Sequence, residues 1–156
     1  MSFGFQSNGG GGSAIPTLYE EIPINSAQIL SLGSSIQLLP NSGINKYYII
    51  DQVAIEYTFN GIAYVFPSSQ TFYLDGAFDS YIDKAILTSN TDTVATISGN
   101  LRNTYNVGTG SGATFVKTNK DVLNTNLIMG MQNNDNPING NGTLLVKIWY
   151  RIETKG

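Results

Sequence analysis

The sequence predicts an all-β fold of the sandwich or barrel type, preceded by a flexible arm. Apolar and polar residues alternate with a period of two along several segments, which is typical of strands with one buried face. Short clusters of Asn and Gly separate these segments, as turns do between antiparallel strands. With 156 residues the chain has room for one domain, which we assign to residues 14–156.

The strongest strand prediction is the segment 143–153 near the C-terminus. Its expected buried face is apolar throughout, with Leu144, Val146, Ile148, Tyr150 and Ile152. The opposite face holds Thr143, Lys147, Arg151 and Glu153 together with two apolar residues, Leu145 and Trp149. A helical period would scatter the apolar set around the axis, so a half-buried strand fits best.

A second long strand is predicted for residues 47–59. Its expected buried face carries Ile49, Val53, Ile55, Tyr57 and Phe59, with Asp51 as the one polar intruder. Asn60 and Gly61 follow directly and lead into the β-rich segment 62–66. Because Asn-Gly between two such runs is the strongest short-range signal for a type I′ hairpin, we expect 62–66 to pair with 47–59.

Several shorter elements complete the expected fold. Strands are expected at 19–24, 36–39, 71–74, 94–97, 113–117 and 127–131. The segment 26–32 fits either one helical turn or a strand end, and 78–87 is the one stretch that could hold a short helix. The run 139–142, Asn-Gly-Asn-Gly, is expected to form the turn before the last strand.

The low charge of the chain limits the functions it can have. Charged residues make up 12% of the total, about half of the ~25% in an average protein. Such a surface suits close packing of copies, because little like-charge repulsion opposes it. The net charge of −3 argues against a nucleic-acid partner. No segment reaches the ~20 apolar residues of a membrane span, so no membrane partner is expected.

The sequence offers few groups for catalysis. It has no His and no Cys, which removes Ser-His-Asp triads, thiol nucleophiles and the usual zinc ligands. The best carboxylate cluster is Asp75, Asp79 and Asp83, whose spacing matches neither an EF-hand nor a glycosidase signature. We expect an acidic loop in which Asp79 or Asp83 caps a turn. The Gly-rich run 108–113 lacks the Lys-Ser/Thr pair of a phosphate loop, so no catalytic, cofactor-binding or metal residue is assigned.

Residues 1–13 form the expected arm. Four consecutive glycines, 9–12, cannot pack a core and favour a mobile coil. Phe3 and Phe5 near its tip suggest a docking peptide for another protein, and an artificial linker is the alternative.

Outward aromatic rings on the strands could bind sugars or pack against a neighbouring subunit. Leu145 and Trp149 would leave apolar area exposed on a monomer, and closed symmetry would bury it. We therefore predict both as subunit contacts in preference to a ligand platform.

Several segments, taken in order, carry a resemblance. They are SAQILSLG at 26–33, IQLLP at 36–40, Gly43 and Lys46 before the long strand, GIAY at 61–64, and GNGTLLVKIWYR at 140–151. This ordered set resembles small all-β proteins encoded among the structural genes of tailed bacteriophages, of the head-fibre, decoration or tail-fibre type. Residues 75–120 match nothing in that group.

The resemblance implies an antiparallel β-sandwich of jelly-roll type, a homotrimer without catalytic residues or cofactor, made in the bacterial host cytoplasm and built into the virion. Its implied partners are copies of itself and capsid or other virion proteins. The alternative is a receptor- or carbohydrate-binding module of a tail fibre, with a host-surface glycan as partner. A glycosidase-like depolymerase is the enzymatic alternative, and it requires a carboxylate pair brought together by the fold.

Overall fold

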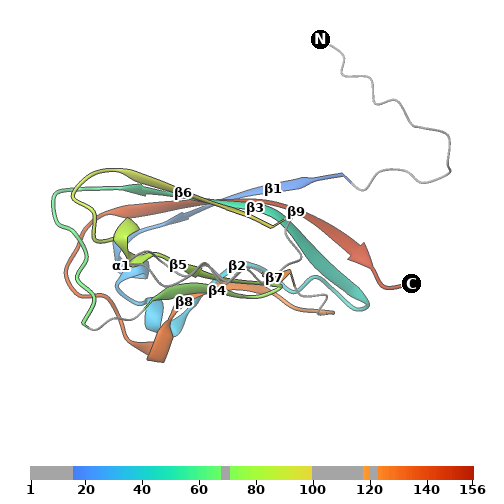
Figure 1. Cartoon of the computed structure of the whole chain (residues 1–156). Coiled ribbons are helices and arrows are strands. Elements are labelled where there is room, and N and C mark those ends of the chain that lie inside the picture. Colours follow the sequence, from blue (N-terminus) through green and yellow to red (C-terminus); the bar gives the residue numbers. More distant parts are fainter. Residues whose placement is uncertain (1–15, 68–70, 100–117, 120–122) are drawn as a thin grey trace, which may run out of the picture.

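The chain folds as two antiparallel β-sheets packed face to face. The computed structural model describes residues 16–67, 71–99, 118–119 and 123–156. The two sheets form the two layers seen edge-on in Figure 1, with the C-terminus at the end of the upper layer. The predicted all-β sandwich is therefore confirmed.

The first sheet contains four strands in the spatial order β1-β9-β3-β6. Their bounds are Leu18–Ile24 for β1, Lys46–Thr58 for β3, Thr93–Ser98 for β6 and Thr143–Thr154 for β9. All three pairings between them are antiparallel. The long ladder of β3 and β9 forms the centre of this sheet, and β1 and β6 are its edges.

The second sheet has the order β2-β8-β4-β5-β7. Its strands are Ile36–Leu39 (β2), Phe72–Gly76 (β4), Phe78–Ile82 (β5), Thr118–Asn119 (β7) and Leu127–Met131 (β8). The predicted strands at 36–39 and 127–131 have the bounds expected from the sequence. The strand expected at 113–117 lies outside the described residues.

The strand pairing is that of a jelly roll. Leaving aside the short β7, the described strands pair as β1 with β9, β2 with β8, β3 with β6 and β4 with β5. These pairs are nested, the first strand with the last and the innermost two with each other. Such nesting arises when a long antiparallel ribbon rolls up into two four-stranded sheets, the jelly-roll architecture found in viral capsid and lectin domains.

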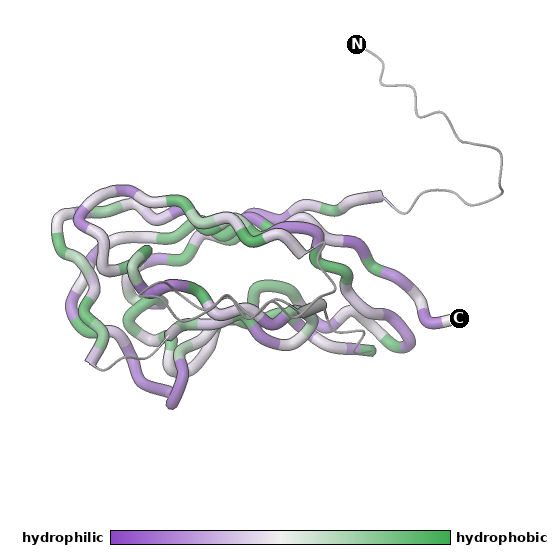
Figure 2. The backbone as a smooth tube through the Cα atoms, in the orientation of Figure 1, coloured by the Kyte–Doolittle hydropathy of each residue, from purple (hydrophilic) through white to green (hydrophobic). Residues whose placement is uncertain are grey.

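The core lies between the sheets and is almost entirely apolar. Residues of alternating hydropathy follow one another along the strands of both layers (Figure 2). The last strand behaves as predicted, since Leu144, Val146, Ile148 and Tyr150 are buried and the residues between them are half-buried. The largest side chains that are fully buried are Tyr57, Tyr64, Phe72 and Phe78.

One prediction for β3 is wrong because the strand contains a β-bulge. The pairing with β9 shifts between Ile50 and Gln52, so Asp51 is an extra residue with no partner position opposite it. Before the bulge Tyr48 and Ile50 point into the core, whereas after it Val53 begins the buried set. Ile49 therefore does not share the buried face, and Asp51 does not lie in the core.

The hairpin predicted at Asn60-Gly61 is also absent. Both edges of β3 are already occupied by β9 and β6, so 62–66 has no place in that sheet. The segment instead docks on the loop before β9: the Ile62 N–H donates to the Asn141 side chain (3.0 Å), and the Asn60 amide donates to the Asn141 carbonyl (3.1 Å). Gly61 has a positive φ, but Asn60 is not among the residues that do, unlike in a type I′ turn.

The short elements follow local capping signals. Helix α1 (Ser26–Ile29) is the single turn allowed by the sequence, and Asn25 and Gln28 form a capping box at its start. Turns of 3-10 helix follow at Leu32–Ser34, Lys84–Ile86 and Gln132–Asn134. The first half of the segment 78–87, considered for a short helix, is strand β5, and the helical part is only the 3-10 turn Lys84–Ile86. Among the described residues, no helix is long and apolar enough to cross a membrane.

Candidate interaction surface

The outer face of the first sheet carries the residues predicted as subunit contacts. Leu145 and Trp149 lie on β9 and point away from the core, and both are half-buried by their neighbours in the sheet. Across the ladders, Pro23 and Glu56 flank Leu145, whereas Tyr19 and Gln52 flank Trp149. We call this surface the first outer face, defined by the outward residues of β1, β9, β3 and β6.

Trp149 is held in place by an aromatic neighbour. Tyr19, directly opposite on β1, packs on the indole with 5.0 Å between ring centroids and a 40° tilt. The Tyr19 hydroxyl donates to the Glu21 carboxylate, and this hydrogen bond raises the pKa of Tyr19 to about 12. One side of the indole is thus already covered, which leaves Trp149 less suited to stacking on a ligand.

A central ion pair neutralises charge on the same face. Lys147 Nζ lies 2.6 Å from Glu56 Oε1, and this hydrogen bond raises the pKa of Lys147. Glu21 lies opposite Lys147 on the other side and adds a weaker attraction of the same sign. The apolar side chains of the first outer face therefore lie beside charges that already have partners.

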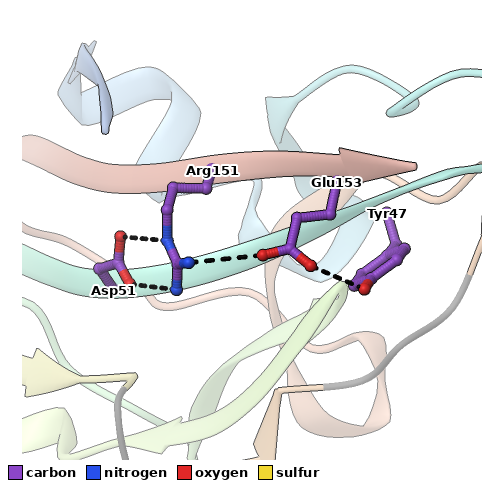
Figure 3. A network of polar contacts seen from close by, with 4 residues as sticks. All are labelled: Tyr47, Asp51, Arg151 and Glu153. Carbon is purple, nitrogen blue, oxygen red and sulfur yellow. Dashed lines mark hydrogen bonds and ion pairs between the residues drawn. The ribbon is translucent and has the colours of Figure 1, made fainter. Parts of the chain in front are cut away.

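A second network marks the far end of the β3–β9 ladder (Figure 3). Arg151 donates two hydrogen bonds to the bulged residue Asp51, at 3.2 Å from Nε and 3.1 Å from Nη2. Its Nη1 lies 3.4 Å from Glu153 Oε1, and Glu153 also accepts from the Tyr47 hydroxyl at 2.8 Å. These bonds raise the pKa of Arg151 and fix the side chains that border the first outer face at this end.

The edges of the first sheet expose further apolar area. On β6, Val94 is 68% exposed beside Glu56, and on β1, Tyr19 is 45% exposed. Of the described strands, β1 and β6 each have one edge without a paired neighbour. The face is thus mixed, with apolar side chains between ion-paired ones, which suits contact with another protein surface.

The second sheet carries a different feature, a half-open pocket of about 320 Å³. It is lined by Tyr73, Leu74, Asp75, Asp79, Ser80, Tyr81 and Gln132. Two of the three clustered carboxylates therefore meet here, on strands and not in the loop that we expected. Asp83 is not part of the lining; it caps the turn that follows β5 by accepting from the Ala85 N–H at 2.8 Å, as the sequence suggested.

The hairpin that carries this pocket, but not its register, could have been predicted from the sequence. Asp75-Gly76 stands between the β-rich segments 71–74 and 78–82, and Asp-Gly is a strong hairpin signal. Gly76 has a φ of 102°, and Tyr73 and Tyr81 face each other across the hairpin. A two-residue turn at Asp75-Gly76 would pair Tyr73 with Phe78, so this signal predicts the hairpin but not the observed pairing of Tyr73 with Tyr81.

Other predicted sites cannot be placed. Phe3, Phe5 and the glycine-rich run 108–113 lie outside the described residues. Within the part of the chain that the structure describes, no three Asp or Glu residues come together as metal ligands would.

Comparison with known proteins does not assign the chain to a family. No family model matches the chain, and no curated protein matches it either. Among solved structures, the chain is similar to one described as the capsid asymmetric unit of cyanophage Pam1, with a TM-score of 0.44 and 12% identity over 96% of this chain and 93% of that one. Because this similarity is low, the jelly-roll assignment rests on the strand pairing alone.

Proposed function

We propose that the chain is a structural protein of a bacteriophage virion, a homotrimeric head-fibre or capsid-decoration component that assembles through its first outer face. The observation that carries the proposal is the composition of that face. Leu145 and the Tyr19–Trp149 pair offer apolar area, while Lys147 and Arg151 are already paired with carboxylates. A neighbouring copy could therefore bury this apolar area beside cations that already have carboxylate partners.

The fold and composition are consistent with this role. Jelly rolls build viral capsids, but the same architecture serves lectins, so the fold alone does not select the function. The 12% of charged residues favours assembly, as does the resemblance of the ordered motifs to phage structural proteins. The proposed role requires neither catalysis nor a cofactor.

The mass of the purified chain in solution tests the proposal. We expect light scattering to give three times the 16.8 kDa of one chain. Leu145→Glu should reduce that mass to one chain, because a second carboxylate next to Glu56 would be buried in the interface without a cation of its own. Val94→Lys, at a largely exposed position of the same face, is a second variant that should fold normally and weaken assembly.

Tyr81→Lys, on the outer side of the second sheet, is the matched control and should keep the mass of the unaltered protein. A monomeric unaltered protein at micromolar concentration would contradict the proposal. A trimer that persists in both first-face variants would show that the subunits contact each other through a different surface.

In this proposal residues 1–13 dock the assembled protein to the capsid through Phe3 and Phe5. A chain lacking these residues should remain assembled and yet be missing from purified particles. Replacing both Phe residues by Ser in the full chain should have the same effect. Normal incorporation of either variant would exclude the docking role of the arm.

A further inference from the structure

The pocket of the second sheet is built by side chains that point away from the core. Tyr73 and Asp75 on β4 alternate with buried Phe72 and Leu74, so they face outward. On β5, Asp79 and Tyr81 alternate with buried residues in the same way. The pocket therefore opens on the side of the molecule opposite to the first outer face, and an assembly through that face would leave it accessible.

Two tyrosine rings give the pocket its apolar surface. Tyr73 and Tyr81 are cross-strand partners, and Tyr81 is 39% exposed. Tyr73 also faces Gly130 on β8, where an added Cβ would lie 3.0 Å from the Tyr73 hydroxyl oxygen and 3.2 Å from the ring carbon that bears it. The Tyr73 ring thus lies against the bare backbone at Gly130, where a side chain would leave it too little room.

The polar groups of the pocket select the kind of ligand. Asp75 and Asp79 supply carboxylate acceptors, and the Gln132 amide supplies both donors and an acceptor. No Lys or Arg is among the lining residues, so an anionic group would meet only negative charge. A quaternary ammonium could use the rings and carboxylates but would leave the amide and the tyrosine hydroxyls unused.

We propose that this pocket binds a neutral saccharide unit. The C–H face of a pyranose ring would pack on Tyr81, while its hydroxyl groups donate to the carboxylates and exchange hydrogen bonds with Gln132. The volume, at the low end of the ~300–1,000 Å³ typical of small-ligand sites, suits a single sugar unit of a larger glycan. The inference goes beyond the assembly role and does not depend on it.

Binding is favoured over hydrolysis of the sugar. One oxygen of Asp75 accepts from the Gly76 N–H at 2.7 Å, so this carboxylate already serves to shape the hairpin. A glycosidase would need one carboxyl group free to donate a proton and the other free to attack the sugar or activate water.

The test is a titration of the full-length chain with glucose, galactose and N-acetylglucosamine at millimolar concentrations, observed through backbone amide NMR signals. At least one sugar should shift the signals of Tyr73, Asp79, Tyr81 and Gln132 in a saturable manner. Tyr81→Ala should weaken that affinity about tenfold, because it removes the stacking surface. Asp79→Asn should also weaken it without unfolding the protein.

Tyr19→Ala is the matched control, since it removes an exposed ring from the opposite sheet and should leave sugar affinity unchanged. Absence of any saturable shift with all three sugars would overturn the proposal. Shifts with tetramethylammonium but not with sugars would show that the pocket recognises a cation instead. Release of reducing sugar from an oligosaccharide, abolished in Asp79→Asn, would make the site hydrolytic and equally overturn it. None of these results would alter the mass by which assembly is tested.

Discussion

The ladder of β3 and β9 is held differently at its two ends. At the end near Thr143, the buried rings of Tyr57 and Tyr64 pack against the glycines of the 139–142 loop. Their ring centroids lie 6.3 Å apart. In the half of the ladder toward the other end, the bulge at Asp51 is tied to Arg151 by two surface hydrogen bonds. One end therefore depends on the shape of a filled core and the other on charge in partial contact with water.

This difference predicts at which positions the protein can tolerate amino-acid substitutions. The end near Thr143 is filled by buried side chains. Even a small added group there should therefore lower the free energy of unfolding strongly. A charged surface end is screened by solvent and salt, so its contribution to stability is modest. Three predictions, each with its own control, test the contrast.

The largest effect is expected for Gly142→Ala. Gly142 does not have a positive φ, so alanine is free of backbone strain, but its Cβ would overlap the Tyr57 ring and lie 2.7 Å from the Thr58 carbonyl oxygen. Tyr57 is fully buried and cannot move aside. We expect the free energy of unfolding to fall by about 3 kcal/mol, measured by denaturant unfolding.

Gly61→Ala separates steric overlap from backbone strain. Gly61 has a φ of 103° and nothing within 4 Å of an added Cβ, so only the strained conformation is tested. Gly61→Ala should lower the free energy of unfolding by about 1 kcal/mol. If both variants lost the same stability, tight packing at Gly142 would not be the cause.

An intermediate effect is expected for Tyr64→Phe. The Tyr64 hydroxyl donates to the Gly142 carbonyl at 2.7 Å, and burial raises the pKa of Tyr64 to about 12. The unaltered folded state therefore keeps a proton that the unfolded state loses near pH 10. The stability linked to this proton is fully present below pH 10 and is lost as the pH rises toward 12.

Removing the hydroxyl should cost about 1–2 kcal/mol at neutral pH, because the Gly142 carbonyl loses its buried donor. It should also flatten the fall in stability between pH 10 and 12, although other buried tyrosines keep part of that slope. Unfolding curves across this pH range provide the measurement, with exposed Tyr81→Phe as control. An unchanged slope in Tyr64→Phe would contradict the assignment.

The two ends also differ in how well the sequence predicts them. The alternation in β9 predicts its buried face correctly, because every inward position is apolar and pairing with β3 and β1 leaves that period intact. The same reasoning fails in β3 at Ile49. A single bulged residue inverts the face that follows, and the position of a bulge depends on the partner strand, which periodicity does not contain.

Local turn signals fail or succeed for a similar reason. Asn60-Gly61 has the residue types of a hairpin turn, yet β9 and β6 occupy both edges of β3, so no edge is free for 62–66. Asp75-Gly76 has an equivalent signal, and there the following strand does find a free edge beside β4. The carboxylate pair of the candidate pocket is thus a product of topology as much as of sequence spacing.

The smallest effect is expected at the charged end of the ladder. Arg151 and Asp51 are 30% and 20% exposed, so their two hydrogen bonds are partly screened by water. A double-mutant cycle with Arg151→Met and Asp51→Ala should give a coupling on the order of 1 kcal/mol at low salt, and less in high salt. Lys147 and Glu56, joined by a single contact on the same two strands, form the comparison pair and should couple more weakly. A coupling at Asp51 that exceeds the cost of Gly142→Ala, or that ignores salt, would mean that the bulge belongs to the core and that the two ends do not differ as described.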